Sequence, residues 1–350
     1  MSVILGLNFG DEGKGLTTSF LCSQTKKPLV VRANGGHQAG HTVVHNGNRH
    51  VFSSFGAGTL QGVPTYWSSY CTFSPISFLH EFDLLKSNHI DPIIYVNPLC
   101  PVTTPFDIGY NRAIEKGNRH GSVGVGFGAT IQRQENYYKL FVQDLFYESV
   151  LVAKLKNIAS YYRAFLNVDA EIENFLEYVR EVKKIIRLSD DSILKTQGYI
   201  PVFEGAQGIL LDMDFGFFPN VTRSNTTSKN ALNLYHSDEI YYVTRSYLTR
   251  HGNGFLPNEK KLDLINNEHE TNKTHEYQGE FRTAQLNVEL LNYALACDNQ
   301  FSRNLKKNLI ITCADQFPID VEVLLGKLNT DFNNVYVSKG DSLNNISLFK

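Results

Sequence analysis

A carboxylate stands inside a glycine-rich loop near the start of the chain. Residues 8–15 read Asn-Phe-Gly-Asp-Glu-Gly-Lys-Gly, between an apolar run at residues 3–5 and a stretch at 16–21 that resembles the opening of a helix. A strand, a glycine loop and a helix in this order aim backbone N–H groups and a helix N-terminus at an anion. Lys14 adds a positive charge for a phosphate. Asp11 would repel that phosphate unless a metal ion or a substrate proton lay between them, which indicates chemistry as well as binding.

The spacing of this loop differs from that of the standard phosphate loop. The sequence G-x-x-x-x-G-K-[ST] is expected there, whereas Gly6 and Gly13 lie two positions further apart and Gly15 replaces the Ser or Thr. Taken alone, the segment therefore predicts either a phosphate site or an ordinary glycine turn.

A second glycine-rich segment, residues 32–42, combines three glycines with histidines and amide side chains. His37, His41 and His45 have the spacing of a metal-binding helix face. However, each of the three glycines costs a helix about 1 kcal/mol, so we expect a loop rather than a zinc site. A loop that offers His41 to developing phosphate charge is favoured, and a surface turn with incidental histidines is the alternative.

Composition narrows the class of protein. The chain has 350 residues, 42% of them hydrophobic, which is enough for a large core. A net charge of −2 argues against a general nucleic-acid binder, and no apolar run approaches the roughly 20 residues of a membrane span. The chain enters a strand without a charged and apolar leader, and its five cysteines are scattered without CxxC spacing. We therefore expect a cytoplasmic protein with reduced thiols.

The apolar pattern predicts an α/β fold with a parallel-rich central sheet. Strands are expected at residues 3–5, 28–31, 92–96, 200–203 and 308–312. Residues 129–197 contain no Gly or Pro, and their apolar spacing predicts long helices at 150–165 and 172–186. Ligand sites gather at the carboxyl ends of parallel strands, so Asp11, residues 204–208 and Asp315 should converge on one edge. Without a repeat or linker, we expect a single domain over residues 1–350.

Several segments together resemble the adenylosuccinate synthetase family. Residues 10–15 (GDEGKG) and 35–42 (GGHQAGHT) are similar to the first two motifs of that family. Three later segments are similar to further motifs: residues 202–208 to VMFEGAQG, residues 218–227 to YPYVTSSNTT and residues 248–254 to STRVGAG. Residues 311–315 and 338–340 lie where the family has T-K-x-D and S-T-G-P. The resemblance runs from about residue 3 to 342. It implies the fold of that family, with a helical subdomain at about residues 85–195, and a homodimer.

The resemblance also implies a reaction. The family phosphorylates the 6-oxo group of IMP with GTP and displaces the phosphate with the amine of L-aspartate. Asp11 matches the base that removes the N1 proton and a ligand of Mg²⁺. His41 matches the residue that stabilises the transferring phosphoryl group, and Gly40 a carbonyl ligand of the metal.

The remaining site residues follow by position. The matching GTP-phosphate residues are Gly10, Gly13, Lys14, Gly15, Gly40 and Thr42, the guanine-binding residues are Asp315, Ser338 and Gly340, and the nucleotide-substrate residues are Gln38, Val123, Gln207 and Thr222. Asp315 could accept two hydrogen bonds from guanine, which adenine cannot provide, so GTP is favoured over ATP.

The amine-binding segment departs from the family pattern. Residues 277–283 correspond to T-T-G-R-R-R-R-T-G, but only Arg282 remains and Glu280 falls at or beside an arginine position. A carboxylate there would repel a dicarboxylic acid, so a neutral or cationic amine is an alternative to aspartate. The arginine that the family donates across its dimer interface has no clear match, and Arg133 and Lys139 are candidates.

Three other functions stay open beside a GTP- and Mg²⁺-dependent ligase for IMP and aspartate. One is a divergent, viral-type enzyme that uses dGMP, another deoxynucleotide or another amine. Short viral relatives typically lose the carboxylate that matches Asp11, and its presence here weakens that alternative. The others are a nucleotide-binding protein without ligase activity, which retention of Asp11, Lys14 and His41 disfavours, and an unrelated P-loop hydrolase.

Overall fold

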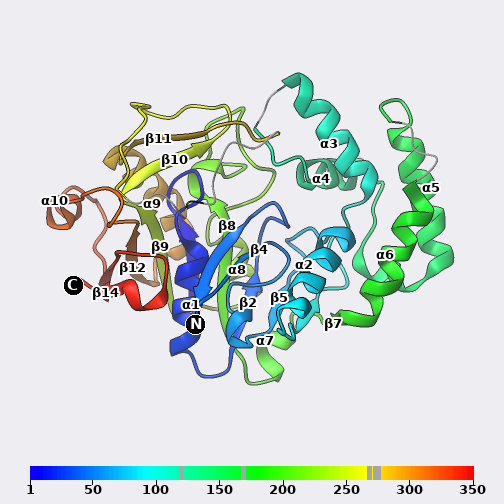
Figure 1. Ribbon diagram of the computed structural model, residues 1–350, viewed down its shortest axis with the longest axis horizontal. Helices are drawn as coiled ribbons and strands as arrows, with labels where there is room; N and C mark the ends of the chain where they lie inside the picture. Colours follow the sequence, from blue (N-terminus) through cyan, green and yellow to red (C-terminus); the bar gives the residue numbers. More distant parts are fainter. Residues whose placement is uncertain (119–120, 167–170, 266–269, 271–276) are drawn as a thin grey trace.

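The centre of the molecule is a single mostly parallel sheet (Figure 1). A computed structural model describes residues 1–118, 121–166, 171–265, 270 and 277–350. In spatial order the strands are β14 (Ile346–Leu348), β13 (Asn334–Ser338), β12 (Lys306–Thr312), β9 (Glu239–Arg245), β1 (Ser2–Gly6), β8 (Ile200–Gly208), β2 (Pro28–Arg32), β5 (Thr65–Trp67), β6 (Ile94–Val96) and β7 (Arg187–Leu188). Only β14 is antiparallel to its neighbour, so the other strands end at one edge. The predicted α/β class is confirmed.

Both faces of this sheet are buried, which explains why its strands are nearly continuous apolar runs. On one face, Val3 and Leu5 of β1 belong to the same core as α9 (Val288–Ser302). On the other face, Ile4 packs in the core that includes Leu21 and Cys22 of α1 (Lys14–Gln24). The alternation of side chains along β1 therefore fixes one helix on each side.

Strand β8 extends further than the sequence indicates, because residues 204–208 continue the strand instead of following it. Its register against β1 shifts, since Ile4 pairs with Glu204 but Gly6 pairs with Gly208. Gln207 has a φ of 64° at this irregularity. A bulge of this kind re-aims a side chain at the end of a strand. Here it carries Gln207 into the wall of the cavity described below.

A second core lies among helices at the β7 end of the sheet (Figure 1). The helices are α2 (Pro75–Ser87), α3 (Pro105–Asn118), α4 (Phe127–Glu135), α5 (Glu148–Tyr162) and α6 (Glu171–Ile185). The two long predicted helices correspond to α5 and α6. The stretch 85–195 also contains β6, β7 and α7 (Ile193–Thr196), which tie this helical region to the central sheet.

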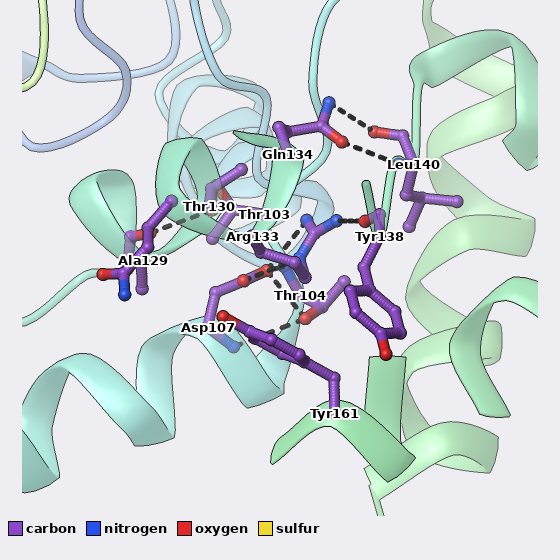
Figure 2. A network of polar contacts seen from close by, with 12 residues as sticks. Thr103, Thr104, Asp107, Ala129, Thr130, Arg133, Gln134, Tyr138, Leu140 and Tyr161 are labelled. Atoms are coloured by element: carbon purple, nitrogen blue, oxygen red, sulfur yellow. Dashed lines mark hydrogen bonds and ion pairs between the residues drawn. The ribbon is translucent and has the colours of Figure 1, made fainter. Parts of the chain in front are cut away.

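Buried polar groups join α3 to α4 within this region (Figure 2). The Asp107 carboxylate accepts hydrogen bonds from Arg133 Nε at 2.8 Å and from the Tyr162 hydroxyl at 2.8 Å. Arg133 is fully buried and also donates to the carbonyls of Val102 and Tyr138. Its guanidinium is used inside the chain, so the expectation that Arg133 could serve a partner subunit is wrong. Lys139 lies exposed.

The smaller elements complete the fold. They are the antiparallel pairs β3 (His41–His45) with β4 (Asn48–Phe52) and β10 (Tyr247–His251) with β11 (Phe281–Gln285), the helices α8 (Lys229–Leu234) and α10 (Val321–Leu325), and the short 3-10 turns η1 (Thr59–Gln61), η2 (Val142–Phe146), η3 (Ile209–Leu211) and η4 (Leu343–Asn345). Among the described residues, no helix has the length and apolar character needed to cross a bilayer.

Candidate active site

A cavity of about 1640 Å³ opens where the glycine loop meets the ends of β8, β10 and β12. Pockets for a single small molecule are usually about 300–1,000 Å³, so this one has room for more than one ligand. The predicted site residues in its wall are Gly10, Asp11, Gly13, Lys14, Gly15, Gln38, Gly40, His41, Thr42, Val123, Gln207, Thr222, Asp315 and Gly340. The convergence of Asp11, the end of β8 and Asp315 on one edge is thus observed.

The glycine loop leaves a helix N-terminus open to the cavity. Gly13 caps α1 with a φ of 90° and no side-chain hydrogen bond, and the first turn of α1 has no acidic residue. Its N–H groups and dipole are therefore available to an anion. At Gly15 a Cβ atom would lie 2.9 Å from His41 Cβ, so only glycine lets β3 approach the loop this closely.

Glu12 holds the loop lysine within the chain. Lys14 Nζ lies 3.2 Å from Glu12 Oε2, and both side chains are at least 97% buried. Burial raises the pKa of the Glu12 carboxyl, against the opposing charge of Lys14 and a hydrogen bond from the Asn8 N–H. The Lys14 ammonium, which a phosphate would attract, is therefore fixed and partly neutralised by Glu12 before a ligand binds.

Asp11 is held in an unusual backbone conformation beside three basic groups. Its φ is 58°, its Oδ2 lies 3.2 Å from His251 Nε2, and its carbonyl accepts a hydrogen bond from Arg245. Burial raises the pKa of the Asp11 carboxyl, but the hydrogen bond and charge of His251, with the charges of Arg245 and Lys14, outweigh it. The net effect lowers the pKa of the Asp11 carboxyl, so Asp11 is an ionised base at neutral pH.

His41 is oriented by Glu204 of β8. Nδ1 lies 2.7 Å from Glu204 Oε1, and because a carboxylate only accepts, Nδ1 carries the hydrogen. Burial lowers the pKa of His41, more than the neighbouring Glu204 raises it. Glu204 also accepts a hydrogen bond from the Ala57 N–H at 3.3 Å, and Arg32 Nη1 lies 3.7 Å away. Among the described residues, only the Nδ1 atom of His41 has a hydrogen-bond partner, so its Nε2 atom can serve a ligand in the cavity.

Two amide side chains in the cavity wall have buried polar atoms without a hydrogen-bond partner among the described residues. Both polar atoms of Gln38 and the Oε1 atom of Gln207 are buried without a hydrogen-bond partner among the described residues. Buried polar atoms are almost always paired in folded proteins. Their positions therefore indicate polar ligand atoms, as expected for residues assigned to the nucleotide substrate. Val123 and Thr222 line the same cavity.

The end of β12 brings the guanine segment next to the glycine loop. Thr312 Oγ1 donates to the Glu12 carbonyl at 2.8 Å, and a Cβ on Gly13 would lie 2.8 Å from the Thr312 methyl. Asp315 follows in the cavity wall and accepts a hydrogen bond from Gln316 Nε2 at 2.7 Å. Ser338 is fully buried and does not line the cavity. Its hydroxyl donates to the Gly340 carbonyl at 2.8 Å, so it shapes the loop.

Neither of the two predicted amine-site residues lines the cavity. Arg282 pairs with Glu259 and donates to the Gly254 carbonyl at 2.8 Å, while Glu280 is exposed. Within the described residues, therefore, the structure does not bring them together with Asp11. The neighbouring residues 266–269 and 271–276 lie outside the described part of the chain.

Sequence reasoning missed His251 and Arg245. His251 had a signal, since it stands where the resembling segment STRVGAG has valine. Arg245 had none, because its role comes from tertiary contacts. Its Nη1 lies 2.7 Å from the Tyr247 hydroxyl and 2.7 Å from Glu270 Oε2, which fixes the guanidinium against the Asp11 carbonyl.

The donor atoms present suit magnesium better than zinc. His37 lies in a loop and His41 and His45 lie on β3, so they do not share a helix face. Within the described residues there is no group of three or more His, Cys, Asp or Glu that could hold a metal. Mg²⁺ commonly takes one or two protein oxygens and completes its shell with phosphates and water. The Asp11 carboxylate and Gly40 carbonyl fit that requirement, since both residues line the cavity.

Comparisons with known proteins agree with one another. The family profile for adenylosuccinate synthetase matches residues 3–318. The adenylosuccinate synthetase of Shewanella oneidensis is 31% identical over 299 residues, covering 79% of this chain and 68% of that protein. The adenylosuccinate synthetase of Buchnera aphidicola is 34% identical over 288 residues, covering 75% of this chain and 66% of that protein.

Two solved structures share the fold at low identity. Fully ligated adenylosuccinate synthetase from Plasmodium falciparum superposes with a TM-score of 0.79 at 17% identity, over 100% of this chain and 99% of that chain. Succinoaminodeoxyadenylate synthetase from cyanophage S-2L, bound to dGMP and to dATP as energy donor, superposes with a TM-score of 0.70 at 16% identity. The match covers 99% of this chain and 94% of that chain.

Proposed function

The chain belongs to the adenylosuccinate synthetase family of carbon–nitrogen ligases, and from this premise we propose that it activates the 6-oxo group of a purine nucleotide with GTP. One observation carries the proposal. The ionised Asp11 carboxylate and the oriented His41 imidazole line the same cavity as the open N-terminus of α1. A base, a phosphoryl-stabilising group and a phosphate cradle are the parts that this chemistry requires.

The first step transfers a phosphoryl group. Asp11 accepts the N1 proton of the purine, which makes O6 nucleophilic, and O6 then bonds to the γ-phosphorus of GTP as the bond to the β-phosphate oxygen breaks. The backbone N–H groups of α1 and the Lys14 ammonium hold the phosphates, and His41 stabilises the charge that moves between them. A magnesium ion held by Asp11 and the Gly40 carbonyl would neutralise phosphate charge.

The second step makes the carbon–nitrogen bond. The amine nitrogen bonds to C6, the C6–O bond breaks, and inorganic phosphate leaves with the oxygen and takes up the proton that the amine loses. With IMP and L-aspartate as the default pair the product is adenylosuccinate. Asp315 in the cavity wall supports GTP as the phosphoryl donor, and a cytoplasmic homodimer is the expected form.

A second pair of substrates is favoured by particular observations. Arg282 faces Glu259 rather than the cavity, and Glu280 is exposed, so the arginine grip expected for aspartate is not assembled among the described residues. The cyanophage S-2L protein that shares this fold is a succinoaminodeoxyadenylate synthetase bound to dGMP. A divergent enzyme that uses dGMP, another deoxynucleotide or another amine therefore remains the alternative.

The test is phosphate release from GTP with IMP, GMP and dGMP, each with and without aspartate. Release that requires a monophosphate and aspartate together supports the ligase. Release that requires a monophosphate but proceeds without aspartate points to another amine. GTP turnover that needs no second nucleotide would instead identify a hydrolase, and binding of GTP without any turnover a nucleotide-binding protein.

A further inference from the structure

A second helix, α4, also begins at the cavity with an open end. Gly126 caps this helix with a φ of 86° and no side-chain hydrogen bond, and the first turn contains no acidic residue. The first N–H group that is bonded within the helix is that of Thr130, which donates to the Gly126 carbonyl at 2.8 Å. The preceding positions, residues 127–129, line the cavity. Their N–H groups and the helix dipole can therefore serve an anion, as at α1.

Arg223 lies along the face of α4 that lines the cavity. A Cβ on Gly128 would lie 3.8 Å from Arg223 Cδ, and Arg223 Nη1 lies 3.1 Å from Glu135 Oε2. All three residues are part of the cavity wall. Gly128 and Glu135 are about two turns apart on one helix. The Arg223 side chain therefore runs along the wall, with its stem at the open end of α4.

The guanidinium of Arg223 is available to a ligand. Arg223 is 49% exposed and Glu135 is 55% exposed, and an exposed ion pair of this kind contributes little to stability. Two other arginines of the wall, Arg245 and Arg250, are at least 94% buried and donate to backbone carbonyls. A ligand would have to break buried hydrogen bonds to recruit either of those, whereas Arg223 can leave Glu135 at low cost.

The residues around Arg223 are those predicted to bind the nucleotide substrate. Thr222 precedes it, and Ser224 follows it and accepts a hydrogen bond from the Gly35 N–H at 3.4 Å. A Cβ on Gly35 would in turn lie 3.3 Å from Gln38 Nε2. Both polar atoms of the Gln38 carboxamide are buried without a partner among the described residues. Because such atoms are almost always paired, we expect polar ligand atoms at this place.

Two open helix ends in one cavity suit two ligands that each carry phosphate. The α1 end lies beside the guanine segment, since Thr312 of β12 donates to the Glu12 carbonyl at 2.8 Å, and it is therefore the end for the phosphates of GTP. The α4 end comes from the helical region instead (Figure 1). It is left for the other nucleotide, whose base must reach Asp11.

We propose that Arg223, with the open N-terminus of α4, binds the 5′-phosphate of the purine nucleotide that is to be aminated. This inference rests on the proposed function and deepens it, because it assigns the group that distinguishes a nucleoside monophosphate from a free nucleoside. Arg223 stands where the resembling segment YPYVTSSNTT has serine. On binding, the guanidinium exchanges Glu135 for phosphate oxygens, which an arginine fork matches bidentately. This phosphate contact needs no residue from a second subunit.

The experiment is calorimetric binding of IMP, GMP and dGMP to the full chain, with GDP and Mg²⁺ present to fill the GTP subsite. Arg223→Met should bind the monophosphates at least about ten-fold more weakly than the wild type, because a hydrogen bond to a charged group contributes that much. The affinity for GDP should not change. Inosine and deoxyguanosine, which lack the phosphate, should not distinguish the two proteins. Unchanged monophosphate affinity in Arg223→Met, or an equal loss with GDP or with the nucleosides, overturns the proposal.

Two matched variants separate phosphate binding from a structural role of the ion pair. Glu135→Gln breaks the same pair but leaves the guanidinium, so monophosphates should bind at least as tightly as to the wild type. Arg180→Met breaks a pair with Glu148 that has the same 3.1 Å separation and similar exposure but lies outside the cavity wall, and it should leave monophosphate affinity unchanged. A loss in either variant as large as that in Arg223→Met overturns the proposal. All of these side chains are about half exposed, so the variants should fold.

The outcome also separates this proposal from the proposed function. Monophosphates that bind and support GTP-dependent phosphate release equally well in the wild type and in Arg223→Met leave the ligase intact and remove the role of Arg223. Failure of all three monophosphates to bind the wild type removes both.

Discussion

The two ends of the cavity differ in how completely their polar groups are paired. At the phosphate end, Lys14 is matched by Glu12, and His41 by Glu204, all at least 94% buried. At the substrate end, Gln38, Gln207 and His251 each have a buried polar atom without a partner among the described residues. The first end is organised by the protein itself. The second is organised around atoms that a substrate must bring.

Substituting Asp11 tests whether the two ends act as one site. Asp11→Ala is expected to nearly abolish turnover, a loss of about 10²–10⁴-fold, because general base catalysis contributes about that much. GTP binding should remain largely intact, since the open N-terminus of α1 is unchanged. Phosphate release and GTP titration measure the two effects. Undiminished product formation by this variant would remove the base role.

Breaking one pair at the phosphate end sharpens the comparison. Glu204→Gln leaves His41 without its anionic partner and Arg32 without its counter-ion, in positions that are almost fully buried. Loss of one member of a buried ion pair costs about 3–5 kcal/mol, and we expect kcat to fall as well. Urea unfolding and steady-state kinetics measure both.

The matched control for Glu204 lies in the network of Figure 2, where Asp107→Asn removes the partner of Arg133 outside the cavity. It should lower the free energy of unfolding to a similar extent while the folded enzyme keeps its kcat. An equal loss of kcat in both variants would mean that the Glu204 effect is one of stability alone.

Acid should weaken the loop that carries His41. Burial lowers the pKa of His37 in this loop to about 4, against a smaller opposing effect of the Val125 backbone. Between about pH 6.5 and 4 the unfolded chain takes up a proton that the folded chain does not, so stability falls as the pH falls through this window. His37 alone should cost on the order of 3 kcal/mol. His41 acts in the same direction.

Urea unfolding at pH 7.5 and pH 4.5, with His37→Gln beside the wild type, measures this loss. The variant should show a smaller difference between the two pH values. Identical pH dependence in both proteins would contradict the burial of a neutral His37.

The smallest effects are expected at the rim of the substrate end. Arg282→Ala breaks a pair in which Glu259 is 46% exposed, so the free energy of unfolding should change by less than about 1 kcal/mol. GTP affinity should not change. If residues 277–283 contact the amine, KM for the amine will change in Arg282→Ala and Glu280→Ala. Unchanged KM in both would exclude the segment from the amine site.

The residues of the phosphate end could be predicted from the sequence because they lie together in short continuous segments. Gly13, Lys14 and Asp11 act through a continuous loop, and Asp315 follows a strand that an apolar run predicts. Parallel topology then brings these segments to one edge.

The rest depends on contacts that no local pattern contains. The bulge in β8 arises from its pairing with β1, and the position of the Arg282 guanidinium is set by its pair with Glu259. The pairing of His251 with Asp11 joins residues from opposite parts of the chain. Side-chain contacts of this kind depend on tertiary packing, so they could not be predicted from residue type and spacing.

The ion pair between Lys14 and Glu12 also bears on how the enzyme behaves among the many small anions of a cell. A bare ammonium at an open helix end would attract sulfate or inorganic phosphate. Here such an ion must first separate two buried charges, and it offers few contacts in return. A nucleoside triphosphate bound as proposed would touch the loop, the helix end and the segment around Asp315 together. The Glu12 carboxylate, as the internal counter-ion of Lys14, thus favours binding of nucleoside triphosphates over binding of sulfate or inorganic phosphate.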